Sequence, residues 1–171
     1  MKNLFLIAII VLGFFAVSFG QDIETATSSA TIVIPISLTK TSDMNFGNVA
    51  VHATNNGTVV LVPAGTRTGT AGVTVSAALG GTVSAATFTV NGANNQTYSI
   101  TLPAGDHEIT RTGGTEVMQV NTFTSNPNGT GTLSAGGAQT VNVGATLNVS
   151  GGQTPGIYTN VGGFEVTVNY N

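Results

Sequence analysis

One cluster of titratable side chains stands out in the sequence, Asp106-His107-Glu108. Two carboxylates and an imidazole can bind a metal ion or exchange protons with a substrate. Neighbouring residues of a β-strand point to opposite faces of the sheet, so in a strand only Asp106 and Glu108 could converge. Gly105 precedes the cluster, and a hydrated hairpin turn explains it more simply. We therefore predict no metal site and no cofactor site.

Other catalytic arrangements are also poorly supported. A serine or threonine nucleophile needs an adjacent base and a third group that orients this base. The two histidines, His52 and His107, both lie among turn residues, and the Gly-x-Ser-x-Gly motif is absent from the sequence. Glycoside hydrolysis needs two facing carboxylates, and the seven acidic residues specify no such pair. The sequence predicts no catalytic residues, no small-molecule substrate and no enzymatic activity.

Residues 1–20 have the pattern of an export signal, with a positive charge at Lys2 and an apolar core from Leu4 to Val17. Small residues then predict cleavage between Gly20 and Gln21. The apolar core is shorter than the roughly 20 residues of a membrane-spanning helix. We expect contact with the membrane only during export. The mature protein is then secreted, or displayed on the outer cell surface after passing through the periplasm.

Charge and cysteine content narrow the class of protein further. The predicted mature chain has three basic residues, Lys40, Arg67 and Arg111, against seven acidic ones, a formal charge near −4. Three scattered cations cannot neutralise a phosphate backbone, so nucleic acid is excluded as a partner. The sequence has no cysteine and therefore no disulfides, and only 6% of its residues are charged. Hydroxyl and amide side chains must provide its polar surface.

Alternation of apolar and polar residues predicts an all-β protein. The clearest strands are Ala30–Leu38, Ala86–Val90, Tyr98–Leu102 and Val141–Val149, separated by turn signals such as Asn91-Gly92 and Gly136-Gly137. About eight to ten short strands at this spacing predict one β-sandwich domain over residues 21–171. An outer-membrane barrel of eight strands is an alternative, but the absence of tryptophan and the few aromatic residues after the signal make aromatic girdles hard to build.

Two irregularities interrupt the alternation. Pro35 lies within the first predicted strand and cannot donate a ladder hydrogen bond, which predicts an edge strand or a bulge. Further on, Met118 and Val120 have one parity, whereas Val117 and Phe123 have the other. A β-bulge between Glu116 and Thr124 would return both groups to the core.

The sequence ends inside a predicted strand, Gly163–Asn171. Its apolar side consists of Phe164, Val166, Val168 and Tyr170, and a strand without an exit loop can pair with another chain. We interpret these four residues first as a core strand and conditionally as an assembly strand. The expected partners are copies of the same chain or other surface subunits.

An ordered set of motifs extends over nearly the whole mature chain. It comprises Ala30–Ile36, Asp43–Gly47, Ala86–Gly92, Tyr98–Pro103, Phe123–Pro127, Gly156-x-Tyr158 and Val166–Tyr170. The set resembles the DUF4402 family of bacterial domains. The resemblance implies a secreted protein of a Gram-negative bacterium with no assigned function. The order of elements is also similar, more distantly, to spore-coat-U and chaperone-usher pilin proteins, whose subunits have incomplete immunoglobulin-like folds.

The pilin resemblance implies a structural protein for adhesion or surface assembly. In pilins, a terminal strand ending near a penultimate tyrosine borders a groove that a neighbour's amino-terminal segment fills. Tyr170 matches that tyrosine and Gly156 the glycine before it. The candidate donor, Gln21–Ser29, contains one large apolar residue, Ile23, and could bury little surface.

Two alternatives therefore stay open. The strand Ile32–Leu38 could complete an immunoglobulin-like sandwich within its own chain. The protein could also be a monomeric extracellular binding module that presents the loops Asn91–Asn95 or Ser125–Gly131 to a glycan or a protein.

Overall fold

The computed structural model describes residues 20–171, so the predicted export signal lies outside the described residues except for Gly20. Gly20 and Gln21, the predicted cleavage site, are exposed and have no regular secondary structure. The same holds for the other residues up to Ile32. Residues 33–171 form one compact unit. No helix within residues 20–171 is long and apolar enough to cross a membrane.

The compact unit confirms the all-β prediction, and its strands form stacked antiparallel sheets. The strands are β1 (Ser37–Ser42), β2 (Asn45–Phe46), β3 (Ala50–Val51), β4 (Gly57–Leu61), β5 (Arg67–Ala71), β6 (Val73–Thr74), β7 (Val83–Ser84), β8 (Ala86–Asn91), β9 (Thr97–Thr101), β10 (His107–Arg111), β11 (Val117–Asn126), β12 (Thr130–Thr132), β13 (Ala138–Val149), β14 (Tyr158–Thr159) and β15 (Thr167–Tyr170). A single 3₁₀ turn, Ala77–Leu79, follows β6.

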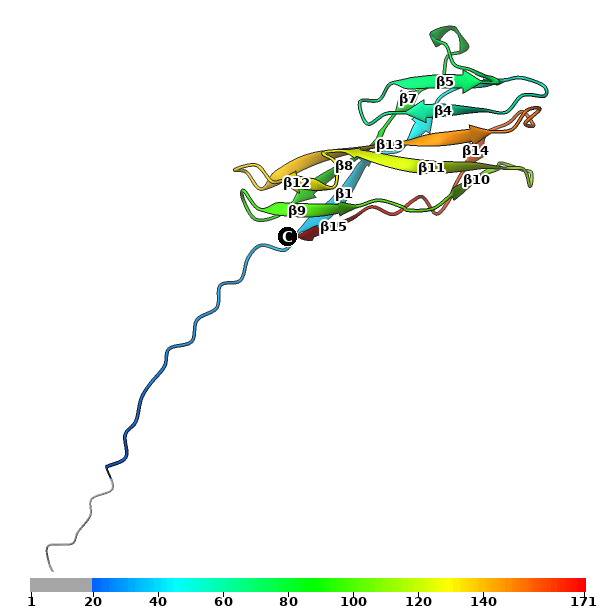
Figure 1. Cartoon of the computed structure of the whole chain (residues 1–171). Helices are drawn as coiled ribbons and strands as arrows, with labels where there is room; N and C mark the ends of the chain where they lie inside the picture. The colour runs from blue at the N-terminus through cyan, green and yellow to red at the C-terminus, as the bar shows by residue number, and fades with distance from the viewer. Residues whose placement is uncertain (1–19) are drawn as a thin grey trace, which may run out of the picture. The chain divides into compact units, whose positions relative to one another are not determined.

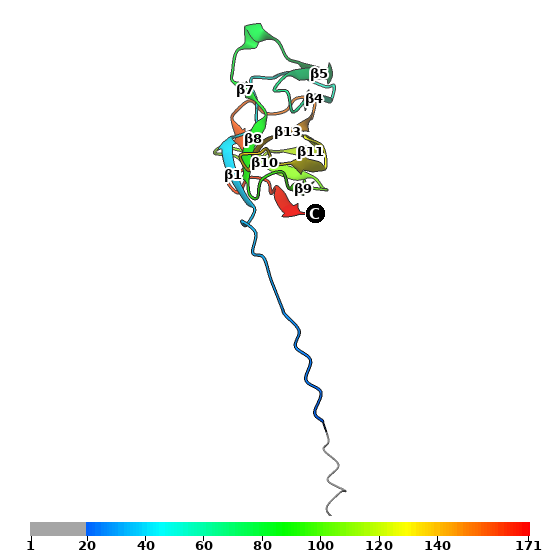
Figure 2. The ribbon, with the colours of Figure 1, turned by 90° about the vertical axis from the view of Figure 1, so that its left-hand side faces the viewer.

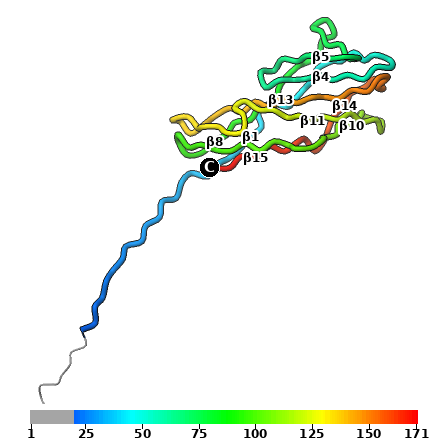
Figure 3. Tube along the Cα trace, viewed as in Figure 1, coloured from blue at the N-terminus to red at the C-terminus, as the bar shows by residue number. Residues whose placement is uncertain are grey.

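The central strand of the main sheet is β13, which changes its neighbour halfway along. One edge pairs with β11, followed by β10 and β14. On the other edge, Ala138–Val143 pairs with β8 and then β1, whereas Ala145–Val149 pairs with β4 and then β5. The second half of β13 therefore lies between β11 and β4 (Figures 1 and 3).

Gly144 lies where β13 changes from one neighbour to the other. A Cβ atom there would overlap the carbonyl oxygen of Leu61 and lie 2.7 Å from the carbonyl carbon of Val62. The side chains around it keep one alternation, with Val141, Val143, Ala145, Leu147 and Val149 buried. The sequence prediction for Val141–Val149 is thus confirmed, and glycine allows two different strands to meet this edge.

A second layer covers the main sheet. Its three-stranded sheet has the order β12-β9-β15, with β15 beside β9 (Figure 2). Between the layers lies a core of buried residues from β8, β9 and β13 and from the segment after β12: Ala86, Phe88, Val90, Tyr98, Ile100, Leu133, Val141 and Val143. This packing of two sheets around an apolar interior is that of a β-sandwich.

A second core forms over the other half of β13. Val59, Val73, Val120, Ala145, Leu147 and Val149 are its buried members. The two-stranded sheets β2-β7 and β3-β6 supply half-buried residues such as Phe46 and Val51 to it. Met44 and Phe123 pack against both cores and connect them.

The predicted bulge is present in β11. Its pairing with β13 shifts between Asn121 and Thr124, and Thr122 adopts a left-handed conformation with φ 51°. The bulge returns Phe123 to the core, as predicted. It does not do so for Val117, which stays 41% exposed. Val117, Met118 and Val120 all precede the bulge in the chain. The shift in register therefore does not change the face to which Val117 points, which is opposite to that of Met118 and Val120.

The first predicted strand is shorter than expected. Instead of Ala30–Leu38, β1 begins at Ser37, and it is an edge strand that pairs only with β8 among the described residues. Ile32 is 95% exposed and Ile34 61% exposed. Pro35, which lacks an N–H, directly precedes the region where pairing begins. The prediction of a peripheral strand is correct, but residues 33–36 form no strand, and of these four residues Ile36 is the one that packs against the core.

Candidate assembly site

The four predicted assembly residues, Phe164, Val166, Val168 and Tyr170, lie on one side of the terminal segment, and we call them the terminal strip. All four are half-buried and pack against the core between β8, β9 and β13. Only Thr167–Tyr170 forms strand β15, in register with β9 from Thr101 to Tyr98. Phe164 and Val166 therefore contact the core through their side chains, without a backbone ladder.

An aromatic cluster fixes the start of the terminal strip. The ring of Phe164 lies 5.0 Å from that of Phe123, 6.2 Å from that of His107 and 6.4 Å from that of Phe88, measured between centroids. The contacts with His107 and Phe88 are edge-to-face, the geometry that aromatic quadrupoles favour. Phe164 thus joins β8, β10 and β11 to the terminal segment.

Tyr170 fixes the other end of the terminal strip. Its hydroxyl accepts a hydrogen bond from the Ala93 N–H at 2.6 Å and donates one to the Ile34 carbonyl oxygen at 2.8 Å. Gly92 makes room for the hydroxyl, since a Cβ atom at this position would overlap it. One side chain therefore connects β15, the β8–β9 loop and the backbone that leads into β1.

The strands β1 and β15 approach each other without forming a ladder. Within residues 20–171, β1 pairs only with β8 and β15 only with β9. Ile36 and Leu38 on the β1 side are half-buried, as is the terminal strip. Two adjacent strand edges thus keep unpaired backbone groups beside a partly covered apolar core.

The segment that precedes β1 is apolar and exposed. Over residues 30–36, which we call the amino-terminal segment, Ala30, Ile32, Ile34 and Ile36 alternate with Thr31, Val33 and Pro35. Val33 is 58% exposed, and only Ile36 is half-buried. From the sequence, these residues were predicted to belong to the first strand, and Gln21–Ser29 was the candidate donor segment. The exposed segment with the stronger apolar alternation is residues 30–36.

The cluster Asp106-His107-Glu108 does not form a turn as a unit, because His107 and Glu108 open β10. As expected for a strand, His107 points to the opposite face from Asp106 and Glu108. The Nδ2 group of Asn121 donates to Asp106 at 2.8 Å and the Nε2 group of Gln119 to Glu108 at 2.8 Å, whereas His107 contacts Phe123 and Phe164. Within residues 20–171 no three His, Cys, Asp or Glu side chains are grouped as metal ligands.

The best-formed ion pair lies at the far end of β10. Arg111 donates from Nε to one Glu116 oxygen at 2.7 Å and from Nη2 to the other at 3.2 Å. The hydrogen bond from Arg111 lowers the pKa of Glu116 to about 2, and the same bond raises the pKa of Arg111. This pair closes the β10–β11 hairpin and has a structural role.

The two loops considered for ligand binding have different neighbours. In Asn91–Asn95, the N–H groups of Gly92 and Asn95 donate to Gly137 and Ser134. In Ser125–Gly131, the Gly129 carbonyl accepts from the Ile100 N–H. The two loops therefore contact different parts of the fold. A binding role for either loop stays a prediction.

Two features of this site could not be predicted from the sequence. The bridge from Tyr170 to Ile34 joins residues far apart in the chain, and no local pattern encodes it. The exposure of Ile32 depends on whether another strand covers it, which alternation cannot show. Pro35 is the residue in the sequence that indicates a limit to strand pairing at this point, because it cannot donate a ladder hydrogen bond.

The fold and the site define a β-sandwich domain with an apolar edge that is unpaired within the described residues. The family model "Domain of unknown function (DUF4402)" matches residues 36–170. The chain therefore belongs to the DUF4402 family, as its motifs predicted. Searches of curated proteins and of solved structures found no significant match.

Proposed function

We propose that the protein is an exported structural subunit of the bacterial cell surface that assembles with copies of itself. One observation carries the proposal: an exposed, isoleucine-rich segment leads into a sandwich that has unpaired, apolar edges at β1 and β15. An extended segment can add to such an edge through backbone hydrogen bonds, while alternate side chains enter the core.

Adding the amino-terminal segment to the edge of a neighbouring subunit would be favourable, because it would bury exposed isoleucines. Burial of a fully exposed isoleucine contributes roughly 1.5–3 kcal/mol. Ile32 is 95% exposed and Ile34 61% exposed, so together they would contribute roughly 2–5 kcal/mol. The half-buried terminal strip would lose its remaining contact with water in the same step. Pro35 has no N–H to donate, so one ladder hydrogen bond would be missing. Its side chain would point away from the core, because it alternates with Ile34 and Ile36.

The resemblance to pilin and coat subunits supports the same proposal. Residues 30–36 replace Gln21–Ser29 as the donor, which removes the objection that the donor is poor in apolar residues. A role in adhesion would follow from display of the assembled subunits on the outer surface.

Size-exclusion chromatography with light scattering and negative-stain imaging of residues 21–171 test the proposal. We expect concentration-dependent oligomers or fibres from the wild-type chain. The double variant Ile32→Asp/Ile34→Asp should be monomeric, because a charge at either position opposes burial. Val161→Asp is the matched control, since Val161 is a fully exposed apolar residue in a turn outside the segment. A wild-type chain that is monomeric at every concentration would contradict the proposal.

A competition experiment tests the identity of the donor. A synthetic peptide with the sequence of residues 29–37 should cap the chain and shorten its oligomers. A peptide with aspartate in place of the isoleucines at positions 32 and 34 should have no effect. If both peptides act alike, the amino-terminal segment is not the donor.

A further inference from the structure

A second surface with the features of a binding site lies on the face of the main sheet that points away from both cores. Strand register aligns five side chains there, which we call the polar row: Glu108, Gln119, Asn148, Thr58 and Thr70. They come from five adjacent strands, β10, β11, β13, β4 and β5. At about 4.8 Å between strands, the row is about 19 Å long.

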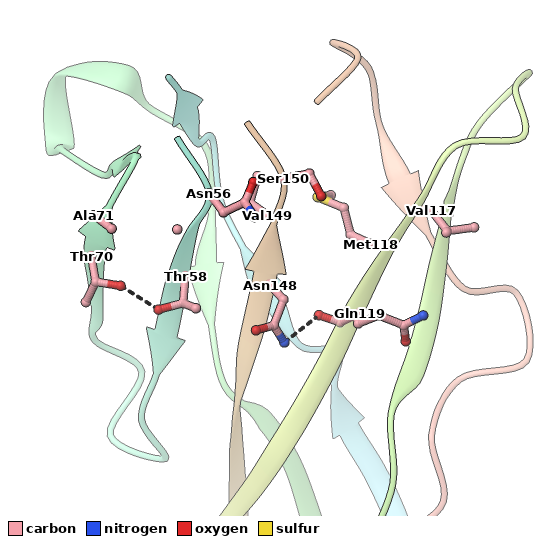
Figure 4. A pocket seen from close by; sticks show the side chains of 11 residues that line it. Asn56, Thr58, Thr70, Ala71, Val117, Met118, Gln119, Asn148, Val149 and Ser150 are labelled. Atoms are coloured by element: carbon pink, nitrogen blue, oxygen red, sulfur yellow. Dashed lines mark hydrogen bonds between the residues drawn. The ribbon is translucent and has the colours of Figure 1, made fainter. Parts of the chain in front are cut away.

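A cavity of about 520 Å³ opens over the polar row. Six of its eleven lining residues have amide or hydroxyl side chains, Asn56, Thr58, Thr70, Gln119, Asn148 and Ser150, and none of the eleven is charged (Figure 4). Its volume is within the range of small-molecule sites, roughly 300–1,000 Å³. The alternation of β13 explains why the cavity is partly polar, because the residues between the buried ones point to this face of the sheet.

The polar row keeps unused hydrogen-bonding capacity. The hydroxyls of Thr58 and Thr70 lie 2.6 Å apart, so one donates to the other and the second hydrogen stays free for a ligand. Asn148 donates from Nδ2 to the Gln119 carbonyl at 3.3 Å, and its amide oxygen is turned toward β4 (Figure 4). Gln119 Oε1 is the one buried side-chain polar atom without a hydrogen-bond partner within the described part of the chain.

An apolar contact lies at one side of the cavity. Val117, which has the parity of Gln119, contributes to its lining, and it is the residue that the bulge in β11 leaves 41% exposed. A sugar ring offers hydroxyl groups at its edge and C–H groups on its face. The row of hydroxyls and amides beside an exposed valine matches both kinds of group.

We propose that this cavity binds a linear, uncharged oligosaccharide lying along the polar row. Two carboxylates, Glu108 and Asp106, lie at the β10 end of the face, where they accept from Gln119 and Asn121. These acidic groups, together with the absence of basic residues from the lining, disfavour an anionic chain. The cavity involves other strands than β1 and β15, so the site would act in a monomer as in an assembly.

Titration of the isotope-labelled chain, residues 21–171, followed by amide NMR shifts, tests the proposal. The neutral probes are cellohexaose, maltohexaose and xylohexaose, and hexagalacturonate is the anionic one. At least one neutral probe should give saturable shifts centred on Thr58, Thr70, Gln119 and Asn148. Hexagalacturonate should give none there. If every neutral probe leaves these amides unchanged, or moves a different surface, the proposal is wrong.

Two variants locate the site. Asn148→Ala and Thr70→Val should each weaken the affinity for the bound probe about five- to tenfold, the loss expected for one or two hydrogen bonds. Thr140→Val is the matched control, because Thr140 is an exposed threonine of β13 on the same face and does not line the cavity. Its affinity should stay within about twofold of the wild type. Equal losses in Thr70→Val and Thr140→Val would overturn the assignment.

Discussion

Replacing Gly144 by alanine should destabilise the whole domain, although the change adds a single methyl group. The Cβ atom would overlap the Leu61 carbonyl oxygen and press against the Val62 carbonyl carbon. These are backbone atoms at the end of β4, so no side-chain rotation can relieve the contact. Either β4 moves away from β13 or the pairing between Ala145 and Leu61 weakens.

The magnitude follows from two opposing effects. Overpacking of this kind costs about 1–3 kcal/mol. Alanine recovers about 0.5–1 kcal/mol, because it loses less conformational entropy on folding than glycine. Because the overlap is with backbone atoms, the upper part of that cost, about 2–3 kcal/mol, applies, and the free energy of unfolding should fall by about 1–2.5 kcal/mol. For a domain of this size, the melting temperature should fall by roughly 2–10 °C.

Urea unfolding, followed by circular dichroism, measures this change. The expected signature is a lower midpoint with an unchanged slope, since the surface exposed on unfolding stays the same. Gly136→Ala is the matched control: Gly136 is exposed, and its new Cβ would meet only the Ser134 hydroxyl at 3.6 Å. Its stability should change by less than about 0.5 kcal/mol. Equal midpoints for the two variants would refute the steric role assigned to Gly144.

Three further changes test other parts of the fold. Tyr170→Phe removes both hydrogen bonds of the hydroxyl and should lower the free energy of unfolding by about 1–3 kcal/mol, with faster hydrogen exchange at the Ala93 amide. In Thr122→Gly, the bulge position at φ 51° loses its strained β-branched side chain. The free energy of unfolding should therefore rise by about 0.5–1 kcal/mol, and the urea midpoint should rise with it. In Glu116→Gln, the ion pair with Arg111 is lost. Because the pKa of Glu116 falls from 4.5 to about 2 on folding, the wild type's advantage over this variant should be complete above about pH 5 and disappear as the pH falls toward 2. An advantage that persists unchanged at pH 2 would show that the ion pair is not its source.

The alternation of apolar and polar residues predicted which side of each of these strands faces the core. Val141–Val149 and Ala86–Val90 alternate as their burial requires, and the change of parity before Phe123 correctly indicated a bulge. Alternation reports the face of a strand because the side-chain period is two. It was also sufficient to place the terminal strip against the core.

Pairing partners could not be predicted in the same way. The exposure of Ile32 and Ile34 depends on the absence of a neighbouring strand among the described residues, which their own alternation does not encode. Nor could the sequence show that β13 serves two neighbours, because Gly144 looks like any other strand glycine. The cavity over the polar row arises from the register of five strands, and Val117 borders it where the sequence had placed a core residue.

The two-neighbour pairing of β13 also bears on the order in which the chain can fold. Leu61 of β4 and Phe88 of β8 pair with Ala145 and Val141, which are synthesised much later. Neither core can close before β13 is available, and such non-local pairing slows folding to roughly milliseconds to seconds. A nascent chain would thus stay open until most of it has been made, which is compatible with the export that we propose for this protein.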